Sequence, residues 1–265
     1  GAAAKMIVEA GGAFGLNDSQ RGRTINFEFV SANPTGPLHI GHTRWAAVGD
    51  SIARLLIASG ATVTREFYVN DAGVQMERFG RSVMAKAKGE RAPKDGYAGT
   101  YIDDLGRRVV EAKPGLLDLD PAEQLTVAGN LAYEFQLSEI QASLADFNVA
   151  FDVWFSERTL HAQPAGGGPS LVDEAVDRLR AQGHVFDDEG AVWVRTTDFG
   201  DDKDRVIRRS NGEYTYFAAD AAYYLNKGDR GFAHKIYLLG ADHHGYVHRL
   251  KAVAGAAGED PEKDR

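Results

Sequence analysis

The sequence predicts an α/β fold, in which a parallel sheet covered by helices is interrupted by an inserted region that is mainly helical. The first observation is a strand, loop, helix, strand order between residues 25 and 69. The second is a long middle stretch with helical periodicity, and the third is a return to the α/β pattern after residue 205. One nucleotide-binding sheet with an insertion explains this order better than two independent domains.

The first half of the fold begins with a βαβ pattern. Residues 25–30 alternate apolar and polar side chains, which predicts a strand, and residues 31–37 form a loop rich in Pro and Gly. Apolar residues then recur at helical spacing from His42 to Gly60, where a helix can end. Residues 62–69 are rich in β-branched and aromatic side chains. Two parallel strands joined by a crossover helix are therefore expected.

The expected insertion covers residues 96–204, and residues 25–95 form the first half of the fold. Within the insertion, residues 97–112 and 120–147 are charged and helical in period, and the second stretch opens with an Asp-Pro pair typical of a helix start. Residues 185–196 are expected to form a hairpin that turns at an Asp-Glu-Gly sequence.

The second half of the fold is expected in residues 205–265, and residues 1–24 are expected to be a linker from a missing amino-terminal domain. The pattern predicts a hairpin over 206–216 that turns at Asn211-Gly212, a helix over 216–225, a strand over 235–239 and a helix over 246–257.

The composition excludes several classes of protein. The chain has 265 residues, of which 43% are hydrophobic and 26% are charged, as in ordinary globular proteins. Its net charge of -8 offers no uniform basic field for nucleic acid, although a local basic face is compatible with it. The absence of cysteine excludes disulfides, thiolate zinc sites and a cysteine nucleophile. Since neither a membrane-length apolar run nor a secretory signal pattern is present, a soluble cytoplasmic protein is expected.

The strongest functional signal is the loop Asn33-Pro-Thr-Gly-Pro-Leu-His39-Ile-Gly41-His42 between the first strand and the first helix. Open α/β sheets bind ligands at this edge, and the following helix amino terminus favours an anion such as phosphate. Both imidazoles can donate to phosphate oxygens, and Gly41 lets the backbone approach a nucleotide. The alternative is that His39 is a helix cap and His42 a surface residue, and an isolated H-x-G-H pattern does not decide between the two.

The residues around this loop, 28–44, resemble the arginyl-tRNA synthetase version of the class I aminoacyl-tRNA synthetase signature. Four further segments resemble the same family in the same order, so that the matches span most of the chain: residues 68–75, 203–206, 214–220 and 239–246. The resemblance implies the Rossmann-like catalytic domain of class I synthetases. It also implies ligation of arginine to its tRNA through arginyl-adenylate, with arginine, ATP with Mg²⁺, and tRNA as partners, in a monomer without a tightly bound metal.

Three parts of the family pattern have no counterpart. Nothing like the second signature, a Lys-Met-Ser-Lys-Ser loop, follows Asp242, and neither the helical anticodon-binding domain nor the usual small amino-terminal domain fits in the sequence. The chain is therefore expected to be a catalytic fragment that aminoacylates poorly or not at all alone.

The resemblance also implies the site residues. His39 and His42 would be catalytic, because they can neutralise the phosphate charge that develops during adenylate formation. The family positions for ATP are Gly36, His39, Gly41, His42, Gly240, Asp242, His243 and His244, and those for arginine are Glu28, Ser31, Asn33, His39, Tyr216 and Asp220. A guanidinium requires acids, which Glu28 and Asp220 would supply, and one helical turn would place Tyr216 on the same face as Asp220. Considered alone, each acid is more typical of a solvated surface charge.

Other residues leave alternatives open. Asp242, His243 and His244 invite a zinc site, but no H-E-x-x-H pattern or third ligand accompanies them, so no metal is expected. Asn70, Asp71 and Gln75 match the family without a clear role. The basic run of Lys203, Arg205, Arg208 and Arg209 is either a contact for the tRNA acceptor end or, more simply, a solvated hairpin face.

Three other functions fit less well. A small-molecule nucleotidyltransferase shares the H-x-G-H chemistry but needs no acid pair, and a non-catalytic paralogue would not need both histidines. A dinucleotide-dependent oxidoreductase is weaker still, because no G-x-G-x-x-G follows the first strand.

Overall fold

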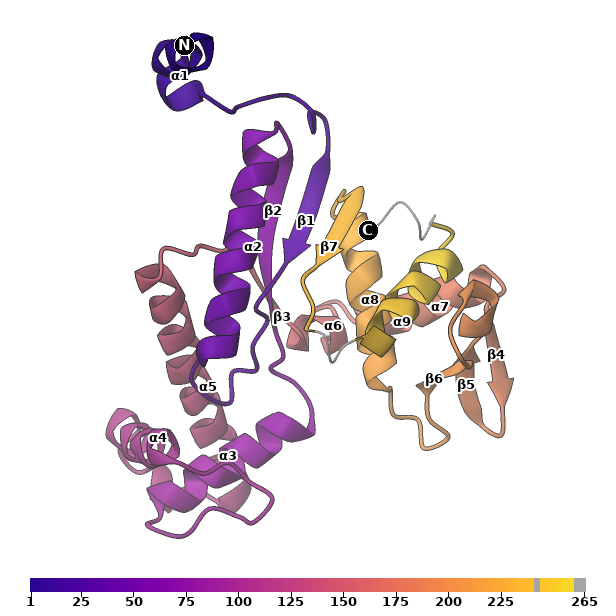
Figure 1. The fold of residues 1–265 in the computed structure, drawn as a ribbon. Coiled ribbons are helices and arrows are strands. Elements are labelled where there is room, and N and C mark those ends of the chain that lie inside the picture. Colours follow the sequence, from indigo (N-terminus) through magenta and orange to yellow (C-terminus); the bar gives the residue numbers. More distant parts are fainter. Residues whose placement is uncertain (241–243, 260–265) are drawn as a thin grey trace.

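A computed structural model describes residues 1–240 and 244–259 and shows a central sheet of four parallel strands (Figure 1). The strand order is β3-β2-β1-β7, and a separate antiparallel sheet has the order β4-β5-β6. The central strands are β1 (Thr24–Glu28), β2 (Thr62–Val69), β3 (Val153–Ser156) and β7 (His234–Tyr237). The predicted α/β class with a parallel sheet is therefore confirmed.

The predicted βαβ unit is also confirmed. Helix α2 (Ile40–Ala58) connects β1 to β2, which pair in parallel, and it ends just before Gly60. One face of the sheet, with Ile25 and Phe27, shares a hydrophobic core with α2 and the end of α5. Strand and helix come very close here, since a Cβ on Gly49 would lie only 2.3 Å from a Phe29 ring carbon.

The opposite face of the same strands carries polar side chains. Asn26 and Glu66 are fully buried, and Glu28 and Tyr68 occupy the same alternation along β1 and β2. This face packs against α8 (Tyr216–Asp229), whose Tyr223 and Lys227 contact these glutamates. Parallel sheets are usually apolar on both faces, so the polar face marks the region that holds charged groups.

Three helices form a second core below the sheet in Figure 1. They are α3 (Val74–Ala87), α4 (Thr100–Ala112) and α5 (Pro121–Asp146), with a short 3₁₀ turn, η2 (Leu116–Asp118), before α5. The two helices predicted in the middle of the chain are confirmed, whereas α3 was not predicted. The stretch expected as the insertion is not separate from the sheet, because β3 follows α5 and pairs with β2.

A third core joins the small sheet to the helices beside it. The elements are α6 (Arg158–His161), α7 (Leu171–Ala181), β4 (Val185–Asp188), β5 (Ala191–Val194), η3 (Thr196–Phe199), β6 (Arg205–Arg208) and α9 (His244–Ala256). The first predicted hairpin is β4–β5. The second is much shorter than expected: its return arm is a single bridge between Arg208 and Tyr214, because α8 begins two residues later.

The start of the chain is helical rather than a plain linker. Helix α1 (Ala2–Ala10) buries none of its residues, leads into the turn η1 (Gly11–Ala13), and projects away from the sheet in Figure 1. Within the described part of the chain, no helix is both long and apolar enough to cross a membrane.

Candidate active site

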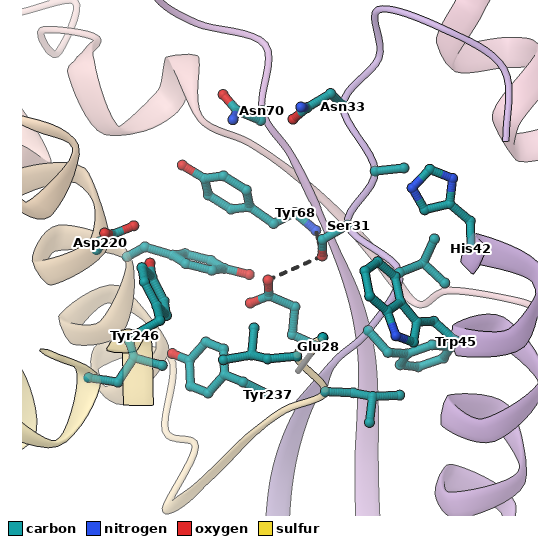
Figure 2. A pocket seen from close by; sticks show the side chains of 18 residues that line it. Glu28, Ser31, Asn33, His42, Trp45, Tyr68, Asn70, Asp220, Tyr237 and Tyr246 are labelled. Carbon is teal, nitrogen blue, oxygen red and sulfur yellow. Dashed lines mark hydrogen bonds between the residues drawn. The ribbon is translucent and has the colours of Figure 1, made fainter. Parts of the chain in front are cut away.

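A cavity of about 430 Å³ opens where the carboxyl ends of β1, β2 and β7 meet helices α2, α8 and α9. Figure 2 shows side chains from all these elements converging on it. The lining includes six residues predicted for the site, which are Glu28, Ser31, Asn33, His42, Asp220 and Gly240. The structure therefore brings together residues that are up to 212 positions apart in the sequence, at the edge of the sheet predicted to bind ligand.

The chain turns sharply where β1 ends. Val30 and Ser31 have φ angles of 68° and 42°, a left-handed conformation that is strained for a β-branched residue. This turn directs the Ser31 hydroxyl to donate to Glu28 Oε1 at 3.1 Å and to accept from the Tyr68 backbone N–H at 3.1 Å. Glu28, Ser31 and Asn33 consequently share one wall of the cavity (Figure 2).

Asp220 lies on the opposite wall, on α8. Burial raises the pKa of this carboxyl group to about 7; a hydrogen bond with Tyr246 opposes the shift, and the nearby acids Glu157 and Glu28 add to it. A cation that enters the cavity would favour the ionised form of Asp220. The cavity is thus suited to a positively charged ligand that reaches between two carboxyl groups.

Tyr216 does not line the cavity, although it lies one turn before Asp220 on α8, as the helical spacing predicted. Its side chain is 67% exposed and lines a separate hollow with Glu157, Arg158 and Tyr214. Tyr216 is the first residue of α8, and the rise of about 6 Å over four residues places it beyond the end of the cavity that Asp220 lines.

The two histidines at the start of α2 cap the helix reciprocally. His39 Nδ1 accepts from the Gly41 N–H at 3.1 Å, and His42 Nδ1 accepts from the His39 N–H at 3.3 Å. The rings stack with centroids 3.7 Å apart. Because an accepting Nδ1 carries no proton, the proton of each neutral ring is on Nε2, which becomes the donor toward a ligand.

His42 lines the cavity, whereas His39 is exposed outside it. Burial, and then the charge of His39, lower the pKa of His42, so the neutral ring dominates near pH 7 in the free protein. The expectation that His39 can be a helix cap is confirmed. Capping uses only the Nδ1 atom of each ring, so Nε2 remains able to donate to a ligand. The positive end of the α2 dipole also favours an anion beside both rings.

The predicted glycines have different surroundings. Gly240 lines the cavity, but Gly36 and Gly41 do not. A Cβ on Gly41 would lie 2.9 Å from His39 Cε1, so glycine leaves room for the capping ring, and Gly36 lies beside Tyr101. Asp242 and His243 lie outside the described residues, as does the side chain of His244.

The structure shows the contacts of Asn70, Asp71 and Gln75, whose roles the sequence leaves open. Asp71 is buried and accepts from Ser156 Oγ at 2.7 Å and from the Arg158 backbone N–H, which ties β2 to the end of β3. Gln75 donates to the backbone oxygen of Asn70, and Asn70 lines the cavity.

The basic run near β6 is partly neutralised by its own segment. Arg205 pairs with Asp201 and Asp202, and Arg209 pairs with Glu213, while Arg208 and Lys203 are exposed. Solvated residues on a hairpin face account for this pattern. Elsewhere among the described residues, no group of three or more His, Asp or Glu side chains is arranged to hold a metal ion.

Aromatic side chains form much of the cavity and were not predicted. Trp45, Tyr68, Tyr223, Tyr237 and Tyr246 line its walls. Tyr68 and Tyr246 lie within segments singled out in the sequence, so a search for aromatic residues in those segments would have found them. Tyr237 lies within the predicted strand 235–239 and is the last residue of β7, and only its position at the carboxyl edge of the sheet could have indicated it.

Comparison with known proteins gives a consistent result. The family model of tRNA synthetases class I (R), catalytic domain, matches residues 6–112 and 136–265. An arginine–tRNA ligase from Pseudarthrobacter chlorophenolicus is 63% identical over 99% of this chain and 46% of its own length. Another from Paenarthrobacter aurescens is 62% identical over 99% of this chain and 47% of its own length.

Solved structures agree with these relatives. A crystal structure assigned as an arginyl-tRNA synthetase from Campylobacter jejuni superimposes with a TM-score of 0.88 at 32% identity, over 100% of this chain and 58% of that one. The arginyl-tRNA synthetase of Thermus thermophilus has a TM-score of 0.68 at 22% identity, over 94% of this chain and 48% of that one, and shares the fold. The chain spans about half the length of the relatives it matches.

Proposed function

Because this chain belongs to the family of class I arginyl-tRNA synthetases and carries their catalytic domain, we propose that its cavity activates arginine with ATP for transfer to tRNA. The observation that carries the proposal is the placement of two acids, Glu28 and Asp220, on facing walls beside the histidine-capped start of α2. A small-molecule nucleotidyltransferase would have no need of such an acid pair.

Arginine would occupy the cavity with its guanidinium between the acids. A guanidinium presents a planar set of N–H donors that carboxylate oxygens accept. Asp220 supplies one carboxyl group, and Glu28 supplies another whose Oε1 atom is held by Ser31. Asn33, at the mouth of the same wall, is suited to the α-amino or carboxylate group of the amino acid.

ATP would lie toward the amino terminus of α2. The carboxylate oxygen of arginine attacks the α-phosphorus, the bond to the β-phosphate oxygen breaks, and pyrophosphate leaves. The Nε2–H groups of His39 and His42 and the N-terminal amides of α2 can donate to phosphate oxygens as their charge grows. Mg²⁺, if it accompanies the nucleotide, neutralises phosphate charge.

The second step would transfer the arginyl group to tRNA. A terminal ribose hydroxyl attacks the adenylate carbonyl carbon, its proton passes to a phosphate oxygen of the adenylate or to water, and AMP leaves with the electron pair of the broken bond. Neither step needs a protein nucleophile, so positioning and charge stabilisation are sufficient. We place this reaction in the cytoplasm, where protein synthesis occurs, with a monomeric enzyme.

Calorimetric titration of the intact protein with arginine and with citrulline tests the proposed binding mode. Arginine should bind more tightly, because citrulline has the same shape without the charge. With the pKa of Asp220 at about 7, the arginine affinity should fall about tenfold from pH 8 to pH 6, while citrulline changes little, because only arginine requires the ionised carboxylate. Equal affinity for both ligands, or an identical pH dependence, would contradict a charged pocket.

A further inference from the structure

A buried lysine lies directly behind Glu28. The Nζ atom of Lys227 is 2.7 Å from Glu28 Oε2, and the lysine side chain is completely inaccessible to solvent. The ammonium group also lies over the rings of Tyr223, at 4.2 Å, and Tyr237, at 3.8 Å. Lys227 does not itself line the cavity, so it can act on a ligand only through its contact with Glu28 and through the electric field of its own ammonium group.

The register of the sheet explains why a cation is needed here. Glu28 on β1 is directly paired with Glu66 on β2, so two acids lie side by side on the same face. The end of helix α8 supplies a cation for each one. Lys227 pairs with Glu28, and Arg230, three residues later, pairs with Glu66 at 2.6 and 2.9 Å.

Asp220 differs from these two acids. It lies two helical turns before Lys227 on α8 and accepts a hydrogen bond from Tyr246. No ion pair to Asp220 exists among residues 1–240 and 244–259. Lys227 therefore offsets the charge of Glu28. The charges of Glu157 and Arg249 act on Asp220 in opposite directions, so the ionised Asp220 leaves about one negative charge at the cavity, which matches one guanidinium.

We propose that Lys227 is a positioning and specificity-determining residue, which holds the Glu28 carboxylate and cancels its charge so that the cavity presents one net negative charge to its ligand. This inference rests on the proposed function only in naming arginine as that ligand. Ser31 donates to one oxygen of Glu28 and Lys227 donates to the other, and each carboxylate oxygen retains a lone pair that can accept a further hydrogen bond.

The sharpest consequence is a rescue. In Glu28→Gln, the ammonium of Lys227 loses its counter-ion and faces the guanidinium through a neutral amide, so arginine affinity should fall by about a hundredfold or more. Adding Lys227→Met removes that cation at similar side-chain volume. The double variant should therefore bind arginine at least about tenfold more tightly than Glu28→Gln alone, whereas a purely structural lysine would make the double variant equal or worse.

Lys235 provides a matched control. It is also buried, pairs with Glu259 at 2.7 Å, and lies over the ring of Tyr224 at 4.4 Å, but it does not face the cavity. Lys235→Met should lower the unfolding temperature without improving arginine binding by Glu28→Gln.

Thermal unfolding without ligand separates this inference from the proposed function. Glu28→Gln with Lys227→Met should unfold at a higher temperature than Glu28→Gln alone, since the single variant buries an unpaired cation. If the wild type shows no preference for arginine over citrulline, the proposed function fails. The unfolding comparison still tests whether Lys227 is the charged partner of Glu28. A double variant that is less stable than Glu28→Gln, or that binds arginine no better, would overturn the inference.

If the Glu28 variants do not fold, Lys227→Met alone decides. Removing a cation near the guanidinium should raise the ratio of arginine affinity to citrulline affinity. Both ligands can bind more weakly in this variant, because Lys227 no longer holds the Glu28 carboxylate in place, but that loss affects both ligands alike. An unchanged ratio would show that Lys227 is only structural and would overturn the inference.

Discussion

Replacing Asp220 by Asn should weaken arginine binding by about tenfold to a hundredfold and leave ATP binding near its wild-type affinity. The substitution keeps the shape of the side chain and removes the acid that forms no ion pair with a lysine or arginine of the described residues. Hydrogen bonds to charged groups contribute roughly 1.5–3 kcal/mol each, which corresponds to the expected loss. Calorimetric titration with arginine and with ATP measures both affinities.

Citrulline and a second acid on the same helix provide the controls. Citrulline should lose less affinity than arginine in Asp220→Asn. Asp229 is the last residue of α8 and is an exposed partner of Arg178 on α7, so Asp229→Asn should leave arginine binding unchanged. Equal losses for arginine, citrulline and ATP would mean that Asp220 is structural, and unchanged arginine affinity in both Asp220→Asn and Glu28→Gln would remove the acid pair from the site.

Replacing His42 by Ala should lower the rate of adenylate formation by about a hundredfold, equivalent to roughly 3 kcal/mol of transition-state stabilisation. The ring lines the cavity, and its Nδ1 is occupied by the backbone N–H of His39, so Nε2–H is directed to donate. His39→Ala should have a similar kinetic effect and also cost about 1 kcal/mol of stability, because it removes the cap of α2. Single-turnover formation of the adenylate, with tRNA present, measures the rate.

His184 gives a suitable control, since it lies near Asp198 beside the small sheet and does not line the cavity. His184→Ala should retain the wild-type rate. A His42→Ala variant with unchanged turnover and only a raised KM for ATP would assign the ring to ground-state binding instead.

Local patterns predict the parts of the fold that have long or regular elements. The alternation in β1 and the helical spacing in α2 were sufficient for the βαβ unit, and α4 and α5 were long enough for their period to be seen. Strand β3 was missed because four residues show no reliable periodicity, and its place in the sheet depends on pairing with β2. Helix α3 was not predicted because its buried face includes Gly80 and Ser82, which interrupt the apolar spacing of a helix.

In the site as well, some residues could be predicted from the sequence and others depend on how the chain packs. Glu28, His42 and Asp220 converge as the family resemblance implies, whereas the position of Tyr216 depends on where α8 begins relative to the cavity. Lys227 could not have been predicted, because a lysine is expected at the surface unless a partner is known. Its partner is 199 positions away, and only the folded packing of α8 on the polar face of β1 brings the two charges together.

Aminoacylation by a protein that contains this chain and has the full length of its relatives is the most direct test of the proposal that this cavity activates arginine, because the 265-residue chain alone is expected to aminoacylate poorly or not at all. Purified protein is incubated with ATP, Mg²⁺ and tRNA, and the attachment of labelled arginine, lysine or glutamine to tRNA is measured. The account predicts that arginine is attached in an ATP-dependent reaction and that lysine and glutamine are not attached at a comparable rate. Attachment of another amino acid in preference to arginine, or no attachment of arginine by folded protein that binds ATP, would contradict it.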